Sequence, residues 1–340
     1  MTLPLALAFA GFTLALLPVQ VPAPSTKQPA EPLRQEPAHL PADSPFASDK
    51  AELVGDGYAF TEGPAWVAGS TDAEGRAASG FFVFCDMRGS RVYRYDNGAE
   101  KPVVLREPSG RAVGSTADAS GTVFNVETET RSITAWSIDS QGTPTAPRTV
   151  TEKISENGEP LGGMNDIALA RDGTLYVTHG TWFLPRGTKS PFTGVLRVAK
   201  DGTTSKAADG LDAPNGVALS PDGRTLYVTE YSAARIQAFE VHADGTLGER
   251  RLIANLMEMA AARGIKARGG ADGLRCDMHG NIYSTGPGGI WVLSPEGQFL
   301  GHLAQPATNI AFGGVDGKTL LITCGSTVMR IGTKTAGAGW

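Results

Sequence analysis

Short apolar runs recur along this chain, and four of them share one pattern. Each copy opens with a polar residue, continues as an apolar strand, and reaches an Asp-Gly or His-Gly pair seven positions after the opener. The copies are NDIALARDGTLYVT from Asn165, NGVALSPDGRTLYVT from Asn215, DGLRCDMHGNIYST from Asp272 and NIAFGGVDGKTLLIT from Asn309. Because Asp-Gly between two apolar runs is a strong turn signal, each copy is predicted to be a β-hairpin.

Two weaker copies stand where the repeat expects them. Glu62 opens EGPAWV, and Val113 opens VGSTADASGTVFNV with Ser120-Gly121 at its turn. The early spacing is about fifty residues, which suits one four-stranded propeller blade per unit. The pattern predicts an all-β fold, a six-bladed β-propeller with four-stranded blades around a central channel.

Composition supports many short strands in one large domain. The 340 residues include 43 Gly and 22 Pro, which favour strands joined by tight turns. One segment, from Leu252 to Ile265, has a helical composition and is expected as an insertion between strands. The formal charge of −5 and the lack of a Lys/Arg block argue against nucleic acid or an anionic membrane surface as a partner.

The beginning of the chain differs from the rest. Residues 1–22 are nearly uncharged and apolar, which predicts a signal peptide, with a single membrane anchor as the alternative. Residues 23–45 are Pro-rich and read as an extended linker, so the propeller is expected over residues 46–340. The protein is then expected to be exported, periplasmic or extracellular, and to be a monomer.

The opening residues of the repeats are candidate ligands. If each opener begins the innermost strand of its unit, Glu62, Asn165, Asn215 and Asp272 face the mouth of one channel, with Asn309 as an optional further member. Carboxylates and carboxamides that converge in this way make an oxygen-donor cage for a hard divalent cation, calcium first. The alternative is that Asn and Asp merely cap turns, although Glu is a poor turn former.

The second strand of each hairpin should return to the same face. That return would bring Asp86, Glu127, His179, Glu230 and Thr285 towards the channel mouth. His179, together with the aromatic residues Trp182 and Tyr231, is expected to line a substrate pocket, because binding residues often lie on loops of a rigid scaffold. The alternatives are a solvated loop histidine and aromatic rings that only roof the channel.

A family resemblance covers roughly residues 52–331. The chain resembles the gluconolactonase, regucalcin (senescence marker protein) family of six-bladed propellers. The motifs are EGPAW at Glu62, MND around Asn165, APNGVALSPDGRTLYVTE around Asn215, ADGLRCDMHGNIYST around Asp272, GGIWVLSPEGQFLG from Gly288 and NIAFGGVDGKTLLIT from Asn309.

The resemblance implies a site and an activity. Glu62, Asn215 and Asp272 would ligate one divalent cation, calcium or zinc, with Asn165 close to the cation or the substrate. Magnesium and manganese are further options. A sugar lactone or similar cyclic ester would be hydrolysed, with the cation as Lewis acid and Asp272 as base.

Two departures from the family pattern lie where the substrate would sit. Val113 stands where many relatives have Asn, and Gly163 stands where regucalcin-like members have Arg. These changes leave the expected cation ligands in place, but they weaken the prediction that gluconolactone itself is the substrate. Two other functions stay open: a non-catalytic propeller whose structural ion supports binding of a protein or glycan, and a metal-dependent esterase or phosphotriesterase.

Overall fold

The computed structural model describes residues 43–69, 80–139, 142–266 and 268–339. This part of the chain consists of β-strands joined by turns, with one short helix. The prediction of an all-β fold is confirmed.

Five hydrogen-bonded sheets make up the fold, and four of them contain four antiparallel strands in chain order. The first two are β5 (Ala112–Ala117), β6 (Val123–Glu127), β7 (Ser132–Trp136) and β8 (Arg148–Thr151), and then β9 (Gly163–Leu169), β10 (Leu175–Gly180), β11 (Gly194–Val198) and β12 (Thr204–Asp209). The next two are β13 (Pro214–Leu219), β14 (Thr225–Glu230), β15 (Arg235–Val241) and β16 (Leu247–Asn255), and then β17 (Leu274–Cys276), β18 (Ile282–Gly286), β19 (Gly289–Leu293) and β20 (Phe299–Leu303).

The fifth sheet joins the two ends of the described chain. It has six strands in the order β21-β22-β1-β2-β3-β4. These are β21 (Asn309–Gly313), β22 (Thr319–Gly332), β1 (Glu52–Val67), β2 (Phe81–Asp86), β3 (Arg91–Tyr95) and β4 (Val103–Arg106).

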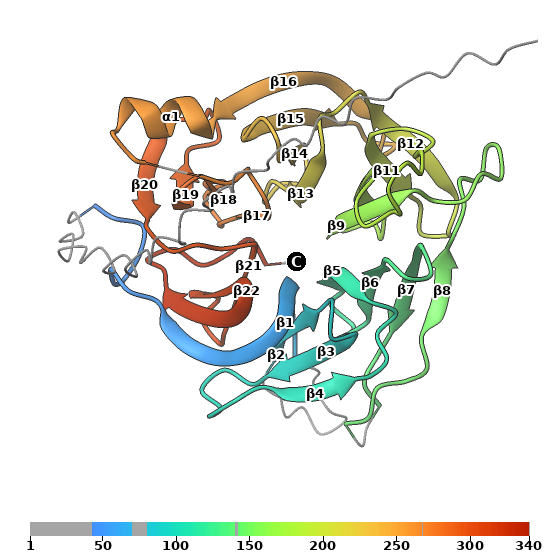
Figure 1. Cartoon of the computed structure of the whole chain (residues 1–340), viewed down its shortest axis with the longest axis horizontal. Helices are drawn as coiled ribbons and strands as arrows, with labels where there is room; N and C mark the ends of the chain where they lie inside the picture. Colours follow the sequence, from blue (N-terminus) through green and yellow to red (C-terminus); the bar gives the residue numbers. More distant parts are fainter. Residues whose placement is uncertain (1–42, 70–79, 140–141, 267, 340) are drawn as a thin grey trace, which may run out of the picture. The chain divides into compact units, whose positions relative to one another are not determined.

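The sheets surround a common centre (Figure 1). The edge strands β5, β9, β13 and β17 face that centre together with β1 and β21. These six strands contact one another in the order β1, β5, β9, β13, β17 and β21, and β21 contacts β1 again. Twisted sheets arranged radially about a channel are a β-propeller, so the predicted fold class is confirmed.

The predicted number of six separate four-stranded blades is wrong, because the structure has five sheets. The last repeat does not form a sheet of its own. The first part of β1 pairs with β22, from Glu52 opposite Arg330, and its second part pairs with β2, from Thr61 opposite Asp86. The pairing register shifts between Asp56 and Thr61, so one long bent strand links the last repeat to the first.

This bend lets the large sheet fold back on itself. Phe82 and Phe84 of β2 belong to the same buried cluster as Leu321 and Val328 of β22. The two halves of the six-stranded sheet therefore bury apolar faces against each other, as separate sheets do elsewhere in the ring.

The hairpins predicted from the repeat are confirmed. β9 pairs with β10, β13 with β14, β17 with β18 and β21 with β22, all antiparallel. The turn glycines Gly173, Gly223, Gly280 and Gly317 all have positive φ angles between 70° and 93°. Glycine adopts this left-handed conformation without the steric cost that a side chain adds.

The predicted helix is present but shorter than expected. α1 spans Leu256–Ala262, whereas Leu252 belongs to the end of β16. Asn255 ends the strand and caps the helix, because its side chain accepts hydrogen bonds from the backbone of Met257 and Glu258.

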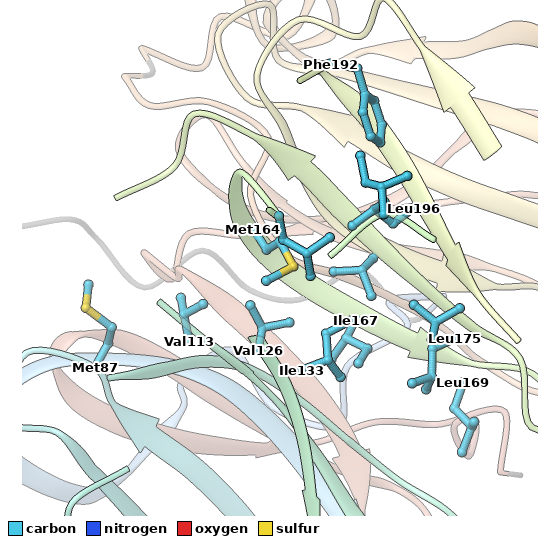
Figure 2. Close-up of a cluster of buried hydrophobic side chains, with 14 residues drawn as sticks. Met87, Val113, Val126, Ile133, Met164, Ile167, Leu169, Leu175, Phe192 and Leu196 are labelled. Atoms are coloured by element: carbon cyan, nitrogen blue, oxygen red, sulfur yellow. The ribbon is translucent and has the colours of Figure 1, made fainter. Parts of the chain in front are cut away.

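Apolar side chains between neighbouring sheets form the core. Figure 2 shows one of these groups, in which residues of the β5–β8 sheet meet residues of the β9–β12 sheet. Val126 and Ile133 come from the first sheet, and Ile167, Leu175 and Leu196 come from the second. Burying these aliphatic side chains stabilises the fold by about 1.5–3 kcal/mol each, so face-to-face packing holds the inner strands in place.

The beginning of the chain lies largely outside the described residues. This applies to the predicted signal or anchor segment, residues 1–22, and to most of the predicted linker, residues 23–45. Phe46, where the propeller was expected to begin, is buried and forms a bridge with Thr333. No helix within the described ranges is long and apolar enough to cross a bilayer.

Candidate functional site: the channel mouth

The four predicted ligands lie at the same end of the inner strands. Glu62, Asn165 and Asn215 are almost fully buried, with 3%, 3% and 2% of their surface exposed, and Asp272 is partly buried. Glu62 belongs to β1, Asn165 to β9 and Asn215 to β13, while Asp272 precedes β17. The structure thus brings the predicted ligands to one end of the channel.

Glycines after the openers let neighbouring inner strands approach closely. A Cβ atom on Gly216 would lie 2.4 Å from the backbone oxygen of Asp272, and one on Gly114 would lie 2.5 Å from that of Asn165. Side chains at these positions would push adjacent openers apart. Close packing of the backbones holds the openers near one another.

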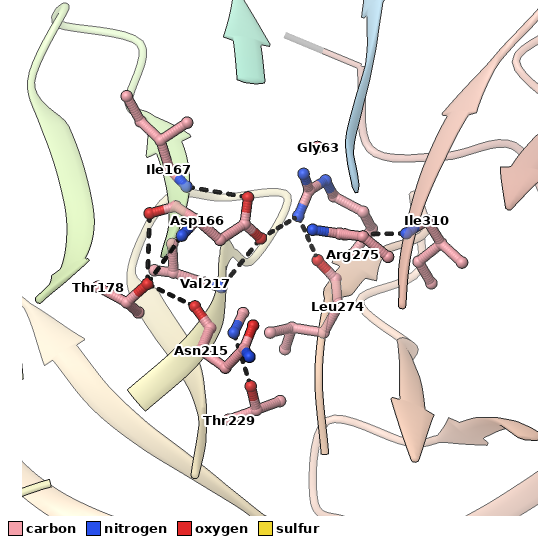
Figure 3. Close-up of polar contacts among 12 residues, drawn as sticks. Gly63, Asp166, Ile167, Thr178, Asn215, Val217, Thr229, Leu274, Arg275 and Ile310 are labelled. Atoms are coloured by element: carbon pink, nitrogen blue, oxygen red, sulfur yellow. Dashed lines mark hydrogen bonds and ion pairs between the residues drawn. The ribbon is translucent and has the colours of Figure 1, made fainter. Parts of the chain in front are cut away.

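Two threonine hydroxyls bond the inner strands to each other. Thr178 accepts a hydrogen bond from the Asp166 amide and donates one to the Asn215 carbonyl. Thr229 repeats this arrangement one sheet further on, between the Gly216 amide and the Asp272 carbonyl. Each hydroxyl therefore fixes the backbone of a predicted ligand in the next sheet, and Figure 3 shows both threonines beside Asn215.

Unpaired oxygen atoms mark the site. Asn165 Oδ1, Asn215 Oδ1 and Asp272 Oδ1 are buried and have no hydrogen-bond partner among the described residues. Buried acceptors without partners are costly, so their convergence calls for a ligand. Together with Glu62 they form an all-oxygen donor set, which fits a hard divalent cation such as calcium.

A cation site at this position would have to use carboxamides. The described residues hold no group of three or more His, Cys, Asp and Glu side chains placed for a metal. Glu62 and Asp272 would supply the carboxylates, and the Asn215 side chain lowers the pKa of Asp272. The donor set depends on the amide oxygens of Asn165 and Asn215 for its remaining positions.

Asn309 differs from the other openers. Its Oδ1 accepts a hydrogen bond from the Ile310 amide at 2.8 Å. Its side chain also interacts with Glu62 and lowers the pKa of that carboxyl. The amide oxygen of Asn309 is therefore already engaged, and its Nδ2 is buried without a hydrogen-bond partner among the described residues.

The electrostatics of the site favour a cation. Burial raises the pKa of Glu62 well above its usual range, and the Asp272 and Asp166 carboxylates raise it further. The pKa of Asp272 is raised in the same way, by burial first and then by Asp166. Buried carboxylates that repel each other either hold protons or take up a positive charge.

The sequence patterns did not reveal an ion pair in the channel. Arg275 Nη1 lies 3.0 Å from Asp166 Oδ2, and Figure 3 shows the two side chains pointing toward each other. Arg275 also donates a hydrogen bond to the Leu274 carbonyl. Two signals in the sequence pointed to this pair: an acidic residue directly after Asn165, and a charged residue inside the apolar run of β17.

Gly163 is required by the loop that covers this end of β9. A Cβ atom there would lie 2.1 Å from the Trp182 carbonyl oxygen, and Gly163 forms a parallel bridge with Thr181. Glycine thus replaces the Arg of regucalcin-like proteins at a position where the backbone of Thr181 and Trp182 packs directly onto the strand. Val113, the other departure, is fully buried in the core.

Trp182 and Tyr231 form an aromatic pair beside the predicted ligands. Their ring centroids lie 5.6 Å apart in an edge-to-face arrangement. Trp182 Nε1 donates a hydrogen bond to the Pro214 carbonyl, next to Asn215 in the chain. The carboxylates of Asp272 and Glu62, after burial, raise the pKa of the Tyr231 hydroxyl, which places Tyr231 close to the cage.

His179 is fully buried and both of its ring nitrogens are engaged. Nε2 accepts a hydrogen bond from the Gly162 amide at 2.7 Å, and Nδ1 lies 3.1 Å from the Phe192 carbonyl oxygen. Its ring stacks on Phe192, and burial lowers its pKa to about 4. In this arrangement the neutral imidazole connects the loop of residues 181–193, through Phe192, to Gly162 just before β9. A substrate would reach the ring only if this loop moved.

Two other residues at the ends of the second strands accept hydrogen bonds from backbone amides near the predicted ligands. Asp86 accepts hydrogen bonds from the Ala59 and Phe60 amides, just before Glu62. Glu230 accepts one from the Asp212 amide, just before β13. The remaining two bond elsewhere: Glu127 pairs with Arg106, and Thr285 donates to the Thr308 carbonyl.

A separate cavity of about 290 Å³ lies at the opposite end of the inner strands. Its lining includes Leu169, Leu219, Phe312 and the C-terminal Ala338, together with Arg275. None of the four predicted ligands lines it. Arg275 therefore stands between this cavity and the channel mouth.

Comparison with known proteins identifies the family. A family profile described as "SMP-30/Gluconolactonase/LRE-like region" matches residues 60–326. The chain belongs to this family.

Two relatives are similar over most of their length. The gluconolactonase of Zymomonas mobilis subsp. mobilis is 28% identical over 315 residues, which cover 85% of this chain and 83% of that protein. A solved gluconolactonase structure from Xanthomonas campestris has a TM-score of 0.70 at 27% identity and covers 86% of this chain and 91% of its own. These similarities confirm the expected enzyme class of this family member, a lactonase-type hydrolase.

A more distant structure shares the fold. The calcium-binding protein regucalcin of Agrobacterium tumefaciens has a TM-score of 0.64 at 19% identity, and the match covers 86% of this chain and 96% of that one. The family profile and the two more similar relatives confirm the family resemblance inferred from the sequence motifs.

Proposed function

We propose that this family member opens a sugar lactone or a similar cyclic ester at the channel mouth, with one divalent cation held by Glu62, Asn165, Asn215 and Asp272. The observation that carries the proposal is the set of buried, unpartnered oxygens on Asn165, Asn215 and Asp272 beside Glu62. Calcium is the first candidate and zinc the second, with magnesium and manganese also to be tested. When bound, such a cation supplies Lewis-acid polarisation of the ester carbonyl.

The chain's own residues would position the substrate and accept the proton that is released during ring opening. Asp272 is the only one of the four residues that is partly exposed, and its buried Oδ1 has no hydrogen-bond partner among the described residues, so it is the carboxylate left able to accept a proton. We assign it the role of general base, which contributes typically 10²- to 10⁴-fold to a rate. The neighbouring Asn215 side chain lowers the pKa of Asp272 and so favours its ionised form.

Trp182 and Tyr231 would bind the substrate ring. Both side chains are partly exposed, and the pKa shift of Tyr231 places its hydroxyl close to the carboxylates. An aromatic face beside polar ligands suits a sugar-like ring with one apolar side. Asn165 is the second candidate for substrate contact, while His179 is proposed to support the loop that carries Trp182.

The test is lactone opening by the full chain on a panel of aldonolactones, before chelation, after chelation, and after each cation is added back. Glu62→Gln and Asp272→Asn should both lower cation-restored turnover by at least about 100-fold. Glu249→Gln and Asp316→Asn are matched controls at exposed positions and should keep turnover. Full turnover in Asp272→Asn would remove Asp272 from the role of base.

The same experiment addresses the alternative functions. A chelator-induced fall in melting temperature without lactone or ester turnover would favour a propeller with a structural ion that binds a protein or glycan. Turnover of aryl esters or phosphotriesters but not of lactones would favour the esterase alternative, which uses the same cage.

Export and oligomeric state form a separate proposal. The apolar residues 1–22 support export to the periplasm or the extracellular space, with cleavage of the signal peptide or retention as an anchor. We propose a monomer. Fractionation with N-terminal sequencing, and light scattering of the purified chain, test the two parts.

A further inference from the structure

Asp166 occupies a position that is glycine in four of the other five repeats and Ile310 in the last one. Gly63, Gly114, Gly216 and Gly273 directly follow the openers of their repeats and face the backbone of the next opener. Asp166 follows Asn165, and its residue surface is fully buried. The ring of inner strands therefore contains one extra carboxylate, directly beside the proposed cation cage.

The backbone holds this carboxylate in place. Its Oδ1 accepts a hydrogen bond from the Ile167 amide at 2.9 Å, and its Oδ2 accepts a longer one from the Val217 amide at 3.4 Å. This side chain is fully buried and directly follows the proposed ligand Asn165 in the chain. Asp166 thus adds negative charge to a site that is already crowded with carboxylates.

Arg275 compensates that charge from the neighbouring strand. Its guanidinium is 3.0 Å from Asp166, with a side-chain exposure of 19% against 0% for the aspartate. Figure 3 shows the guanidinium reaching across to Asp166 from the strand that follows Asp272. The two residues are 109 positions apart in sequence, so only the closed ring brings them together.

The charges of this region balance with one divalent cation. Glu62, Asp166 and Asp272 carry three negative charges when ionised, and Arg275 carries one positive charge, which leaves two negative charges. A single divalent cation neutralises them. Without Arg275 a third negative charge would be buried, and an unpaired buried charge is strongly unfavourable.

We propose that Arg275 is a positioning residue that acts as a built-in counter-cation beside Asp166 and thereby limits the channel mouth to one divalent cation. The inference rests on the proposed cation site. Arg275 does not touch the cation or the substrate; it sets the charge that the cation experiences. Removing its charge should strengthen cation binding, whereas removing the charge of Asp166 should weaken it.

A charge cycle tests this with calcium chloride alone as the probe. Calcium affinity and stoichiometry are measured by calorimetry on the chelated full chain, on Arg275→Met, on Asp166→Asn and on the double variant. We expect one calcium per wild-type chain, and in Arg275→Met either about tenfold tighter binding or a second equivalent. Asp166→Asn should bind about tenfold more weakly, and the double variant should return close to wild type. Arg224→Met, at an exposed turn, is the control.

The opposite signs separate charge from packing. If Arg275→Met does not fold, the comparison of Asp166→Asn with the double variant still tests the role of Arg275. The double variant should bind calcium more tightly than Asp166→Asn alone. Equal affinities in those two proteins, or shifts of the same sign in both single variants, would overturn the role of Arg275.

Failure of the cation site gives a different result. A wild-type chain that binds no calcium, zinc, magnesium or manganese would remove the cation site and this inference with it. A chain that binds one calcium but opens no lactone would remove only the proposed activity, and the charge cycle would still judge Arg275.

Discussion

The hydroxyl of Thr229 donates a hydrogen bond of 2.6 Å to the backbone carbonyl of Asp272, a residue that precedes the first strand of the next sheet. The same hydroxyl accepts from the Gly216 amide at 2.7 Å. One side chain therefore joins the strand that carries Asn215 to the segment that carries Asp272, and it fixes the spacing of two proposed cation ligands.

Thr229→Val should destabilise the protein and weaken cation binding together. The valine has nearly the same shape but leaves a buried amide and a buried carbonyl without a partner, which costs about 1–3 kcal/mol. Urea unfolding measures the loss, and calorimetry with calcium measures the affinity. Thr246→Val, in an exposed turn, should change neither. An unchanged calcium affinity in a destabilised Thr229→Val protein would show that this bond supports the fold alone.

Trp182→Ala should affect substrate binding more than turnover. The indole lies against Tyr231 and bonds to the carbonyl before Asn215, so its loss removes part of the proposed ring platform. We expect KM to rise about tenfold with kcat nearly unchanged, because base and cation ligands remain. Trp182→Phe keeps an aromatic face and should lie between the two. A fall in kcat at constant KM would place Trp182 in the chemical step instead.

Gly163→Ala should disturb the covering loop. The added methyl group would lie 2.1 Å from the Trp182 carbonyl oxygen and 2.4 Å from its amide nitrogen, so the backbone of the loop has to move. Overpacking of this kind costs about 1–3 kcal/mol. Thermal unfolding and KM measure the effect, and Gly339→Ala, which meets no atom within 4 Å, is the control. Equal stability and KM in both variants would mean that the loop adapts freely.

His179 should make stability fall in acid. Its pKa is lowered to about 4 from an ordinary value of 6.5, so between these values the unfolded chain binds the proton and the folded chain does not. Stability attributable to this residue is therefore present above pH 6.5 and is lost as the pH falls toward 4, by up to about 3 kcal/mol.

Urea unfolding at several pH values checks this. The slope of stability against pH between 4 and 6.5 should be shallower in His179→Gln than in wild type. His279→Gln, at an exposed turn, should keep the wild-type slope. Equal slopes in all three proteins would show that the ring of His179 is protonated inside the fold.

The repeat pattern predicted the parts of the fold that are local in sequence. An apolar run followed by Asp-Gly and a second apolar run forms one hairpin, and each such hairpin appears where expected. The number of sheets depends on contacts between the ends of the described chain. Glu52 pairs with Arg330, and no local pattern indicates that β1 bends to join two repeats.

The candidate site likewise combines features that are local in sequence with features that depend on long-range contacts. The position of each opener at the start of a repeat placed Glu62, Asn165, Asn215 and Asp272 at one end of the channel. Burial of His179 depends on how residues 181–193 fold back over the strand, and the Asp166–Arg275 pair depends on closure of the ring. Such long-range relations appear only in the folded structure.

The most direct test of the cation-dependent lactonase is a titration of the chelated full chain with calcium, in which bound calcium and lactone turnover are followed on the same sample. Zinc is titrated in parallel. The account predicts that turnover rises in proportion to bound cation and saturates at one equivalent, and that Asp272→Asn shows no such rise. Turnover that survives chelation, or a bound cation that restores no lactone opening, would contradict it.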